Sequence, residues 1–182
     1  MHKQIIINNK PIHIFDNVVD YEFQTKMYIY IKNSLFGING YDNSILEERH
    51  LTLVSNYTEQ DLYNTGFIIP EEVVNTVSLK DYAITSIMVN LCKPDDIFHT
   101  HIDDITGNGL TLLYYANIKW DLEWGGDTIF LNTQTHDIDY TSQYKPGRFV
   151  LFDGSIPHLI RPSTRLATDY RFTLAIRFRK NE

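Results

Sequence analysis

Cysteine is nearly absent from this chain, since Cys92 is the only one among 182 residues. A single thiol cannot form a disulfide within the chain, and it cannot supply the several thiolates of a zinc site. Stability must therefore come from a buried apolar core. A hydrophobic content of 43% is enough to build such a core, so we expect a single domain over residues 1–182.

Basic residues and long apolar runs are also scarce. The 16 Lys and Arg are outnumbered by 23 Asp and Glu, which gives a net charge of −7. Because nucleic-acid binding requires clustered basic residues, we expect no nucleic-acid partner. No stretch approaches the ~20 apolar residues of a membrane span, and no secretory leader pattern is present. These absences predict a cytoplasmic protein without a membrane partner.

Residues 1–80 are predicted to form a mixed, largely helical support. Two β-prone runs come first, at residues 4–7 and 12–15. A helix is then expected over residues 21–35, because apolar residues recur there every four positions. This stripe consists of Phe23, Met27, Ile31 and Leu35. Two shorter helices follow: one over residues 58–66, opened by the Thr-x-x-Asp pattern of a capping box, and one over residues 70–77.

Residues 81–180 have the pattern of consecutive strands. The predicted strands cover residues 83–91, 111–116, 128–131, 149–152, 156–160 and 170–178. Glycine and proline separate them, as expected for turns. Short strands without intervening helices favour an antiparallel sandwich over a parallel sheet. The predicted fold class is therefore α+β, with a jelly-roll core and N-terminal supporting helices.

Three side chains of the strand region are candidates for one metal site. His101 and Asp103 are two residues apart, and in a strand such residues face the same side. His158 is the candidate for the third ligand. Two histidines and one carboxylate on one face of an octahedral metal leave three positions open, as non-haem Fe(II) oxygenases require. We predict that His101, Asp103 and His158 are both the metal ligands and the catalytic centre.

Further motifs surround these three residues. In chain order they are His101-Ile-Asp103, the tyrosine-bearing strand 112–117, the turn Gly125-Gly-Asp127, the strand 144–152, His158 with the following Pro162, and Arg171 on the final strand. Taken together, this half of the chain resembles the prolyl-4-hydroxylase-like branch of the 2-oxoglutarate- and Fe(II)-dependent dioxygenases. The core of that family is a double-stranded β-helix, which is a form of jelly roll.

The resemblance implies Fe(II), 2-oxoglutarate and O2 as cofactor and co-substrates, with ascorbate in a supporting role. It also implies that Arg171 anchors the far carboxylate of 2-oxoglutarate, for which a planar guanidinium is well suited. Thr173 shares the strand face of Arg171 and can add a hydrogen bond. A tyrosine hydroxyl is expected to do the same. We prefer Tyr115 for this role and expect the adjacent Tyr114 to pack on the opposite face.

Other histidines and acids near the motifs have less specific roles. His99 is expected to line the substrate mouth or to pack, and not to bind the metal. Asp104 is expected to start the turn of the loop at 104–110, although a lid role for that loop stays open. His13 and His50 have no carboxylate two residues away, so both are expected to be structural or at the surface.

Three other arginines leave alternatives open. Arg161 and Arg165 compete with Arg171 as the carboxylate anchor. Arg177 stands where members of the resembled family often carry tryptophan. It either presents a second cation to the pocket, which would suit an acidic substrate, or forms a salt bridge at the rim.

The resemblance implies hydroxylation of an unactivated C–H bond, with succinate and CO2 as co-products. A prolyl or other peptidyl residue is the substrate that it favours. One alternative is a hydroxylase of free amino acids or other small molecules. The alternative from another class is a cupin-like metal-binding barrel without oxygenase activity. Such a barrel has no need for a carboxylate anchor beside its metal, so Arg171 and Tyr115 distinguish the two classes.

Overall fold

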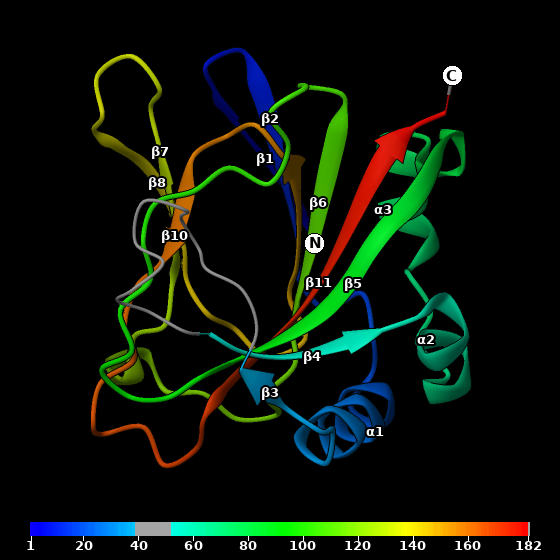
Figure 1. Cartoon of the computed structure of the whole chain (residues 1–182), viewed down its shortest axis with the longest axis vertical. Coiled ribbons are helices and arrows are strands. Elements are labelled where there is room, and N and C mark those ends of the chain that lie inside the picture. Colours follow the sequence, from blue (N-terminus) through cyan, green and yellow to red (C-terminus); the bar gives the residue numbers. More distant parts are fainter. Residues whose placement is uncertain (39–51, 182) are drawn as a thin grey trace.

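The computed structural model describes residues 1–38 and 52–181, which form two antiparallel sheets with helices on one side (Figure 1). The larger sheet has eight strands in the order β1-β2-β9-β6-β11-β5-β4-β3, and the smaller has the order β10-β7-β8. Their bounds are β1 (His2–Ile7), β2 (Lys10–Phe15), β3 (Gly37–Ile38), β4 (Leu53–Tyr57), β5 (Tyr82–Cys92), β6 (Gly109–Tyr115), β7 (Thr128–Leu131), β8 (Ile138–Ser142), β9 (Phe149–Asp153), β10 (His158–Ile160) and β11 (Arg171–Lys180). This arrangement confirms the predicted jelly roll, with sheets that are open at their edges.

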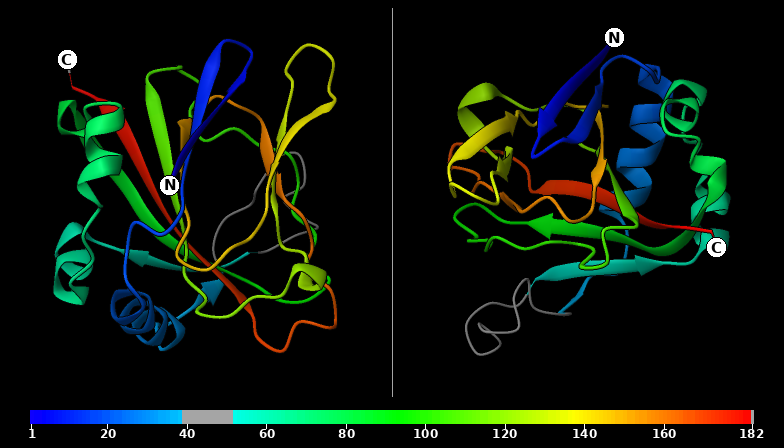
Figure 2. Two further views of the ribbon diagram at one scale, coloured as in Figure 1. Left: turned by 180° about the vertical axis from the view of Figure 1, so that it is seen from behind. Right: turned by 90° about the horizontal axis from the view of Figure 1, so that it is seen from above.

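Three helices cover the face of the larger sheet that points away from the smaller sheet (Figures 1 and 2). They are α1 (Tyr21–Lys32), α2 (Glu59–Thr65) and α3 (Glu71–Thr76), and two 3-10 turns, η2 (Leu79–Asp81) and η3 (Leu122–Trp124), lie elsewhere in the chain. The predicted capping box is confirmed, because the Thr58 side chain accepts from the backbone N–H of Asp61 and the Asp61 side chain accepts in return. None of the helices within residues 1–38 and 52–181 has the length and apolar character that a membrane-spanning helix requires.

The predicted end of α1 is wrong. The helix stops at Lys32, and the Asn33 side chain donates a hydrogen bond of 2.8 Å to the carbonyl oxygen of Ile29. An asparagine that satisfies a terminal carbonyl competes with the next helical turn. Leu35 therefore lies beyond the helix and is 93% exposed, whereas Met27 and Ile31 are buried as expected.

The central strands of the larger sheet are buried on both faces, because the helices cover one face and the smaller sheet covers the other. Alternation along β11 shows the division: Phe172, Leu174 and Ile176 belong to the cluster under the helices, whereas Ala175 belongs to the cluster between the sheets. The same alternation places Tyr114 under the helices and Tyr115 between the sheets. The side chains predicted to bind the co-substrate therefore share the inner face.

The strand predictions are confirmed in the second half of the chain, with small shifts at their ends. The segment of His101 and Asp103 is an exception, because it is not a regular strand. His101 forms an isolated bridge with His158, in which each backbone N–H donates to the carbonyl of the other at 3.0 Å. The chain then turns, so that the backbone N–H groups of Asp103 and Asp104 both donate to the carbonyl oxygen of Gly154 at 2.8 and 3.0 Å. These two hydrogen bonds to one carbonyl take the place of the regular hydrogen bonds between paired strands.

Two histidines expected to lie outside any site have different outcomes. His13 on β2 is 6% exposed, and its Nδ1 lies 3.0 Å from Nε2 of His2 on the neighbouring strand, which confirms a structural role. His50 lies outside the described residues, so its expected role stays a prediction.

Candidate active site

A cavity of about 420 Å³ opens on the inner face of the larger sheet. Its volume lies within the range of small-molecule sites. The polar side chains that line it are Thr52, Asn56, Asn90, His101, Asp103, Thr128, His158, Arg171, Thr173 and Arg177. The cavity therefore brings the three predicted metal ligands together with the predicted carboxylate anchor.

The donor atoms of His101, Asp103 and His158 all lie within 4.8 Å of one another. Nε2 of His158 is 3.5 Å from Asp103 Oδ2, and Nε2 of His101 is 3.9 Å from Asp103 Oδ1. The Nδ1 atoms point the other way, toward backbone carbonyls: His101 toward the oxygen of His99 at 3.0 Å, and His158 toward that of Ile156 at 3.0 Å. A carbonyl only accepts, so each Nδ1 carries the proton and each Nε2 keeps a lone pair.

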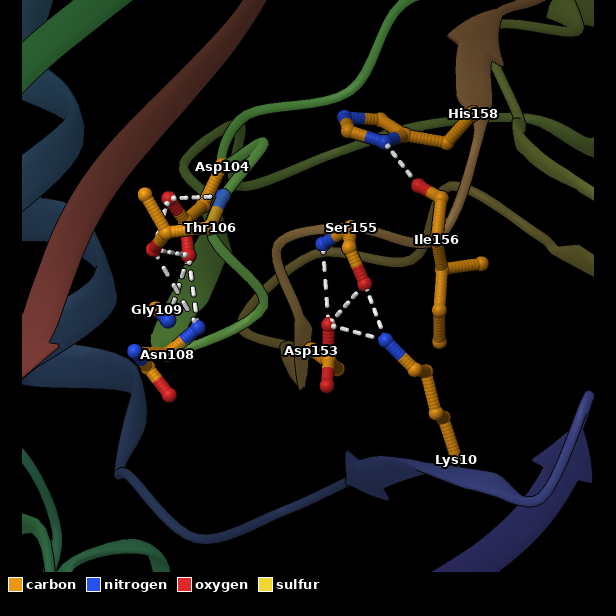
Figure 3. Close-up of polar contacts among 9 residues, drawn as sticks. All are labelled: Lys10, Asp104, Thr106, Asn108, Gly109, Asp153, Ser155, Ile156 and His158. Atoms are coloured by element: carbon orange, nitrogen blue, oxygen red, sulfur yellow. Dashed lines mark hydrogen bonds and ion pairs between the residues drawn. The ribbon is translucent and has the colours of Figure 1, made fainter.

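The turn before His158 is held by a small polar cluster, shown in Figure 3. The Asp153 side chain accepts from the backbone N–H of Ser155 at 2.9 Å and from the Lys10 ammonium at 3.2 Å. The backbone of Ile156 donates to the carbonyl of Asp153 at 3.0 Å, which closes the turn. Because Ile156 also accepts from the imidazole of His158, this turn sets both the position and the ring orientation of that histidine.

Burial and charge shift the pKa values of His158 and Asp103. Burial lowers the pKa of His158 to about 4, and the Asp103 carboxylate offsets only part of that effect. His158 is therefore a neutral imidazole near pH 7, the form that binds metals. Burial also raises the pKa of Asp103, but His158 and then Arg177 outweigh it, so the pKa of this carboxyl is lower than usual.

The Asp103 carboxylate has two further partners that define its orientation. The Thr111 hydroxyl donates to Oδ2 at 2.7 Å, and the Arg177 guanidinium donates to Oδ1 at 2.5 Å. Thr111 was not predicted as a site residue, although alternation along the strand puts it on the same face as Tyr115, four positions away. Arg177 forms a salt bridge, as one alternative expected, but its partner is a metal-ligand candidate inside the cavity and not a residue of the rim.

Arg171 is completely buried, with 0% of its surface exposed. Its Nε donates to the carbonyl oxygen of Gly126 at 2.7 Å, and Nη1 donates to Thr173 Oγ1 at 2.5 Å. The guanidinium carbon lies 4.7 Å from the ring centre of Tyr144, an arrangement that favours a cation. Within residues 1–38 and 52–181, no carboxylate pairs with Arg171. The protein thus holds a desolvated cation without a counter-ion at the cavity.

The two-glycine turn before β7 gives Arg171 its backbone acceptor. Gly126 has a φ of +79°, and a Cβ at this position would lie 3.1 Å from Arg171 Cδ and 3.2 Å from Cζ2 of Trp120. Only glycine allows the backbone to approach the arginine this closely. The glycine pair of the sequence motif is therefore explained by the packing of Arg171.

Tyr115 lies between the sheets with its hydroxyl pointing toward the arginine. The hydroxyl donates to Thr128 Oγ1 at 2.8 Å, and Thr128 in turn lies 3.4 Å from Nη2 of Arg171. Thr128 lines the cavity, so Tyr115 contacts the cavity wall through the Thr128 hydroxyl. Tyr114 packs under the helices, which supports the register that we preferred.

Comparison with known proteins explains this constellation. The family model of the 2OG-Fe(II) oxygenase superfamily matches residues 87–179, about half of the chain. The chain belongs to this superfamily. Comparison with curated proteins finds no match. Membership implies Fe(II), 2-oxoglutarate and O2, and the two histidines and one carboxylate are the donor set that Fe(II) oxygenases use.

Solved structures of the superfamily share the fold. A prolyl-4-hydroxylase from Pseudomonas putida is 14% identical, with a TM-score of 0.67 over 94% of this chain and 93% of that chain. A prolyl hydroxylase from Trichoplax adhaerens, in complex with a hypoxia inducible factor peptide fragment, is 20% identical, with a TM-score of 0.64 over 93% and 83%. A viral collagen prolyl hydroxylase from Paramecium Bursaria Chlorella virus-1, in a 2OG complex, is 13% identical, with a TM-score of 0.61 over 93% and 96%.

The two arginines that compete with Arg171 as the carboxylate anchor lie away from the cavity. Arg161 pairs with Asp127 at 3.6 Å, and Arg165 pairs with Asp95 at 2.5 Å with its side chain 88% exposed. Neither lines the cavity, so Arg171 is the better placed of the three to bind a carboxylate.

Asp104 starts the turn that was expected of it. Its carboxylate accepts from the backbone N–H groups of Thr106, Asn108 and Gly109, as Figure 3 shows. His99 is not among the three clustered metal-ligand candidates, as expected, and its carbonyl orients His101.

Proposed function

We propose that the protein is an Fe(II)/2-oxoglutarate-dependent dioxygenase that hydroxylates an unactivated C–H bond of a prolyl or other peptidyl residue, with succinate and CO2 as co-products. His101, Asp103 and His158 are the iron ligands in this proposal. The observation that carries it is Arg171: a fully buried cation, which has no carboxylate partner among residues 1–38 and 52–181, lines the same cavity as the three metal donors. A dicarboxylate that chelates the metal supplies the missing anion.

The side chains have separable tasks in this proposal. Nε2 of each histidine and the carboxylate of Asp103 hold the iron, which with 2-oxoglutarate and O2 supplies the oxidising chemistry. Arg171 would form a bidentate pair with the far carboxylate, since its planar guanidinium lines the same cavity as the three metal donors. Thr173 and Thr128 lie beside the guanidinium and complete the polar end of the cavity, while Tyr115 orients Thr128.

A peptidyl substrate is supported by the fold and by the surface beside the ligands. The similar solved structures include prolyl hydroxylases, one of them bound to a peptide fragment. Ile102, between the two ligands of the His-x-Asp motif, lines the cavity and is 41% exposed, and Ile105 is 87% exposed. Exposed apolar side chains beside a site of this kind suit an extended peptide better than a small polar metabolite.

Two linked measurements test the proposal. The purified protein, kept anaerobic with Fe(II) and 2-oxoglutarate, should develop the visible charge-transfer band of a chelated complex. After admission of O2, mass spectrometry of proline-containing peptides should show the gain of one oxygen atom together with succinate. A missing band would favour the metal-binding barrel without oxygenase activity. A band with oxygen gained only by free amino acids would replace the peptidyl substrate with a small molecule.

A further inference from the structure

Arg177 contacts a metal-ligand candidate directly. It lies on β11 opposite Thr111 of β6, and the two side chains hold different oxygens of Asp103, Arg177 on Oδ1 at 2.5 Å and Thr111 on Oδ2 at 2.7 Å. Protein groups thus hold both oxygens of the carboxylate. The Asp103 side chain is 4% exposed, whereas the Arg177 side chain is 33% exposed and lines the cavity.

A local irregularity of the sheet lies at Arg177. On β5, Ser86 pairs with Arg177 and Ile84 pairs with Phe178, so Thr85 is an extra residue at this point of the ladder. The Thr85 hydroxyl donates to the carbonyl oxygen of Arg177 at 3.2 Å. Bulges of this kind change the direction of a side chain and are common beside active sites. The irregularity therefore lies where β11 directs a cation toward Asp103.

The charge of Asp103 requires a partner in the metal-free protein. A buried carboxylate without a positively charged partner strongly destabilises the folded protein. Within residues 1–38 and 52–181, Arg177 is the one arginine or lysine that pairs with Asp103. A metal ion bound by the same carboxylate must share it with this guanidinium.

We propose that Arg177 is a positioning residue that acts as the internal counter-ion of Asp103. In the metal-free protein it keeps the carboxylate ordered at the cavity wall, and in the loaded protein it weakens the hold of the site on the metal by sharing the same charge. The inference rests on the proposed function, because it requires His101, Asp103 and His158 to bind the metal.

The proposal predicts that Arg177 contributes more to the stability of the metal-free protein than to that of the metal-bound protein. Replacement by Met keeps the length of the side chain and removes its charge, which leaves Asp103 without a counter-ion until a metal supplies one. Stability and metal affinity are linked by a thermodynamic cycle, so a loss of stability confined to the metal-free protein must appear as tighter metal binding. A residue that only packs would lower stability equally in both states.

The test compares wild type, Arg177→Met, Arg177→Lys and the control Arg179→Met. Arg179 lies on the same strand, is exposed and forms no described ion pair. Thermal unfolding is measured after chelation and again with saturating Co(II), which has similar ligand preferences to Fe(II) and is stable in air. We expect the midpoint of metal-free Arg177→Met to fall by about 5 °C, a value reduced for the partial exposure of Arg177.

Added Co(II) should restore most of that loss, and Co(II) should bind Arg177→Met roughly 10-fold more tightly than wild type. Arg177→Lys should stay closer to wild type in both measurements because it keeps the charge. Arg179→Met should change neither the unfolding midpoint nor the affinity for Co(II). Should Arg177→Met not fold without metal, Arg177→Gln, which is also neutral, and Arg177→Lys carry the same comparison.

Four results would overturn the proposal. An equal loss of midpoint with and without Co(II) would reduce Arg177 to a packing residue. Weaker Co(II) binding by Arg177→Met would give the opposite sign to the one required. Absence of any Co(II) effect on the wild type would overturn the metal site and this inference together, whereas a normal effect on wild type that Arg177→Met shares unchanged would count against Arg177 alone.

Discussion

Two arginines project from the same face of β11 into opposite surroundings. Arg171 is 0% exposed and has hydrogen bonds to neutral groups only, the carbonyl of Gly126 and the hydroxyl of Thr173 among them. Arg177 is partly exposed and pairs with the carboxylate of Asp103 at 2.5 Å. The cation that is better buried is thus the one without a counter-ion, which is the reverse of what desolvation alone would favour.

The difference separates a binding role from a supporting one. A buried cation without an anion costs several kcal/mol, so a fold retains it where a ligand supplies the anion. A cation paired within the protein has its partner already. In the proposed function, one end of β11 binds the far carboxylate of 2-oxoglutarate, and the other end supports the Asp103 side chain that holds the iron.

Removal of a metal ligand should have the largest effect. Replacement of His101, Asp103 or His158 by Ala deletes one of three donors, so we expect loss of both Fe(II) retention and turnover. The fold should persist, because the two apolar clusters do not include these side chains. Metal analysis after gel filtration, circular dichroism and product formation check the three statements. Full hydroxylation by Asp103→Ala would break the assignment.

Arg171→Ala should come next, with an effect on the co-substrate alone. Truncation leaves the far carboxylate of 2-oxoglutarate buried and unpaired, which costs about 3–5 kcal/mol, so its affinity should fall by roughly 10²–10³-fold or more. Fe(II) affinity should barely change. Arg171→Lys should be intermediate, because it keeps the charge but loses the planar fork.

The control for this prediction is Arg165→Ala, since Arg165 is exposed and pairs with Asp95 outside the cavity. Titration of the anaerobic Fe(II) protein with 2-oxoglutarate measures all three variants. A large loss for Arg165→Ala with little for Arg171→Ala would reverse the roles assigned here.

A smaller effect is expected at Tyr115, which is connected to Arg171 through the hydroxyl of Thr128. Tyr115→Phe removes the donor that orients Thr128, so affinity for 2-oxoglutarate should fall by about 10-fold. The matched control is Tyr114→Phe, since that hydroxyl is buried on the other face of the strand and has no hydrogen-bond partner in the described part of the chain. The same titration compares the two. Equal effects would show that the strand face does not decide the role.

The smallest effect is expected away from β11, at the edge formed by β1 and β2. Burial, and then the neighbouring His2, lower the pKa of His13 below 6.5. The unfolded chain therefore takes up a proton at this position before the folded protein does, so the free energy of unfolding falls as the pH drops through 6.5. Wild type should lose more stability than His13→Gln between about pH 7.5 and about pH 5.5 in denaturant titrations. An equal loss of stability by wild type and His13→Gln over this pH range would contradict the prediction.

Local signals predicted the elements that depend on neighbouring residues. The capping box at Thr58 and the strand at 128–131 were placed correctly, because their patterns lie within a few residues. The strands β4 and β8 were not predicted, since Ser, Asn and Thr side chains interrupt their apolar pattern. Such segments become strands because a partner strand pairs with them, and short-range patterns do not reveal that partner.

By itself the sequence determined the family, the jelly-roll class and the candidates His101, Asp103, His158 and Arg171, because each belongs to a motif whose residue types and order carry the chemistry. Only the tertiary structure decided what surrounds those side chains. The pairing of Arg177 with Asp103, the hydroxyl of Thr111 on the same carboxylate and the lack of a counter-ion at Arg171 all depend on which strands lie side by side and in which register. These are contacts between distant segments, and their geometry is set by the packing of the two sheets.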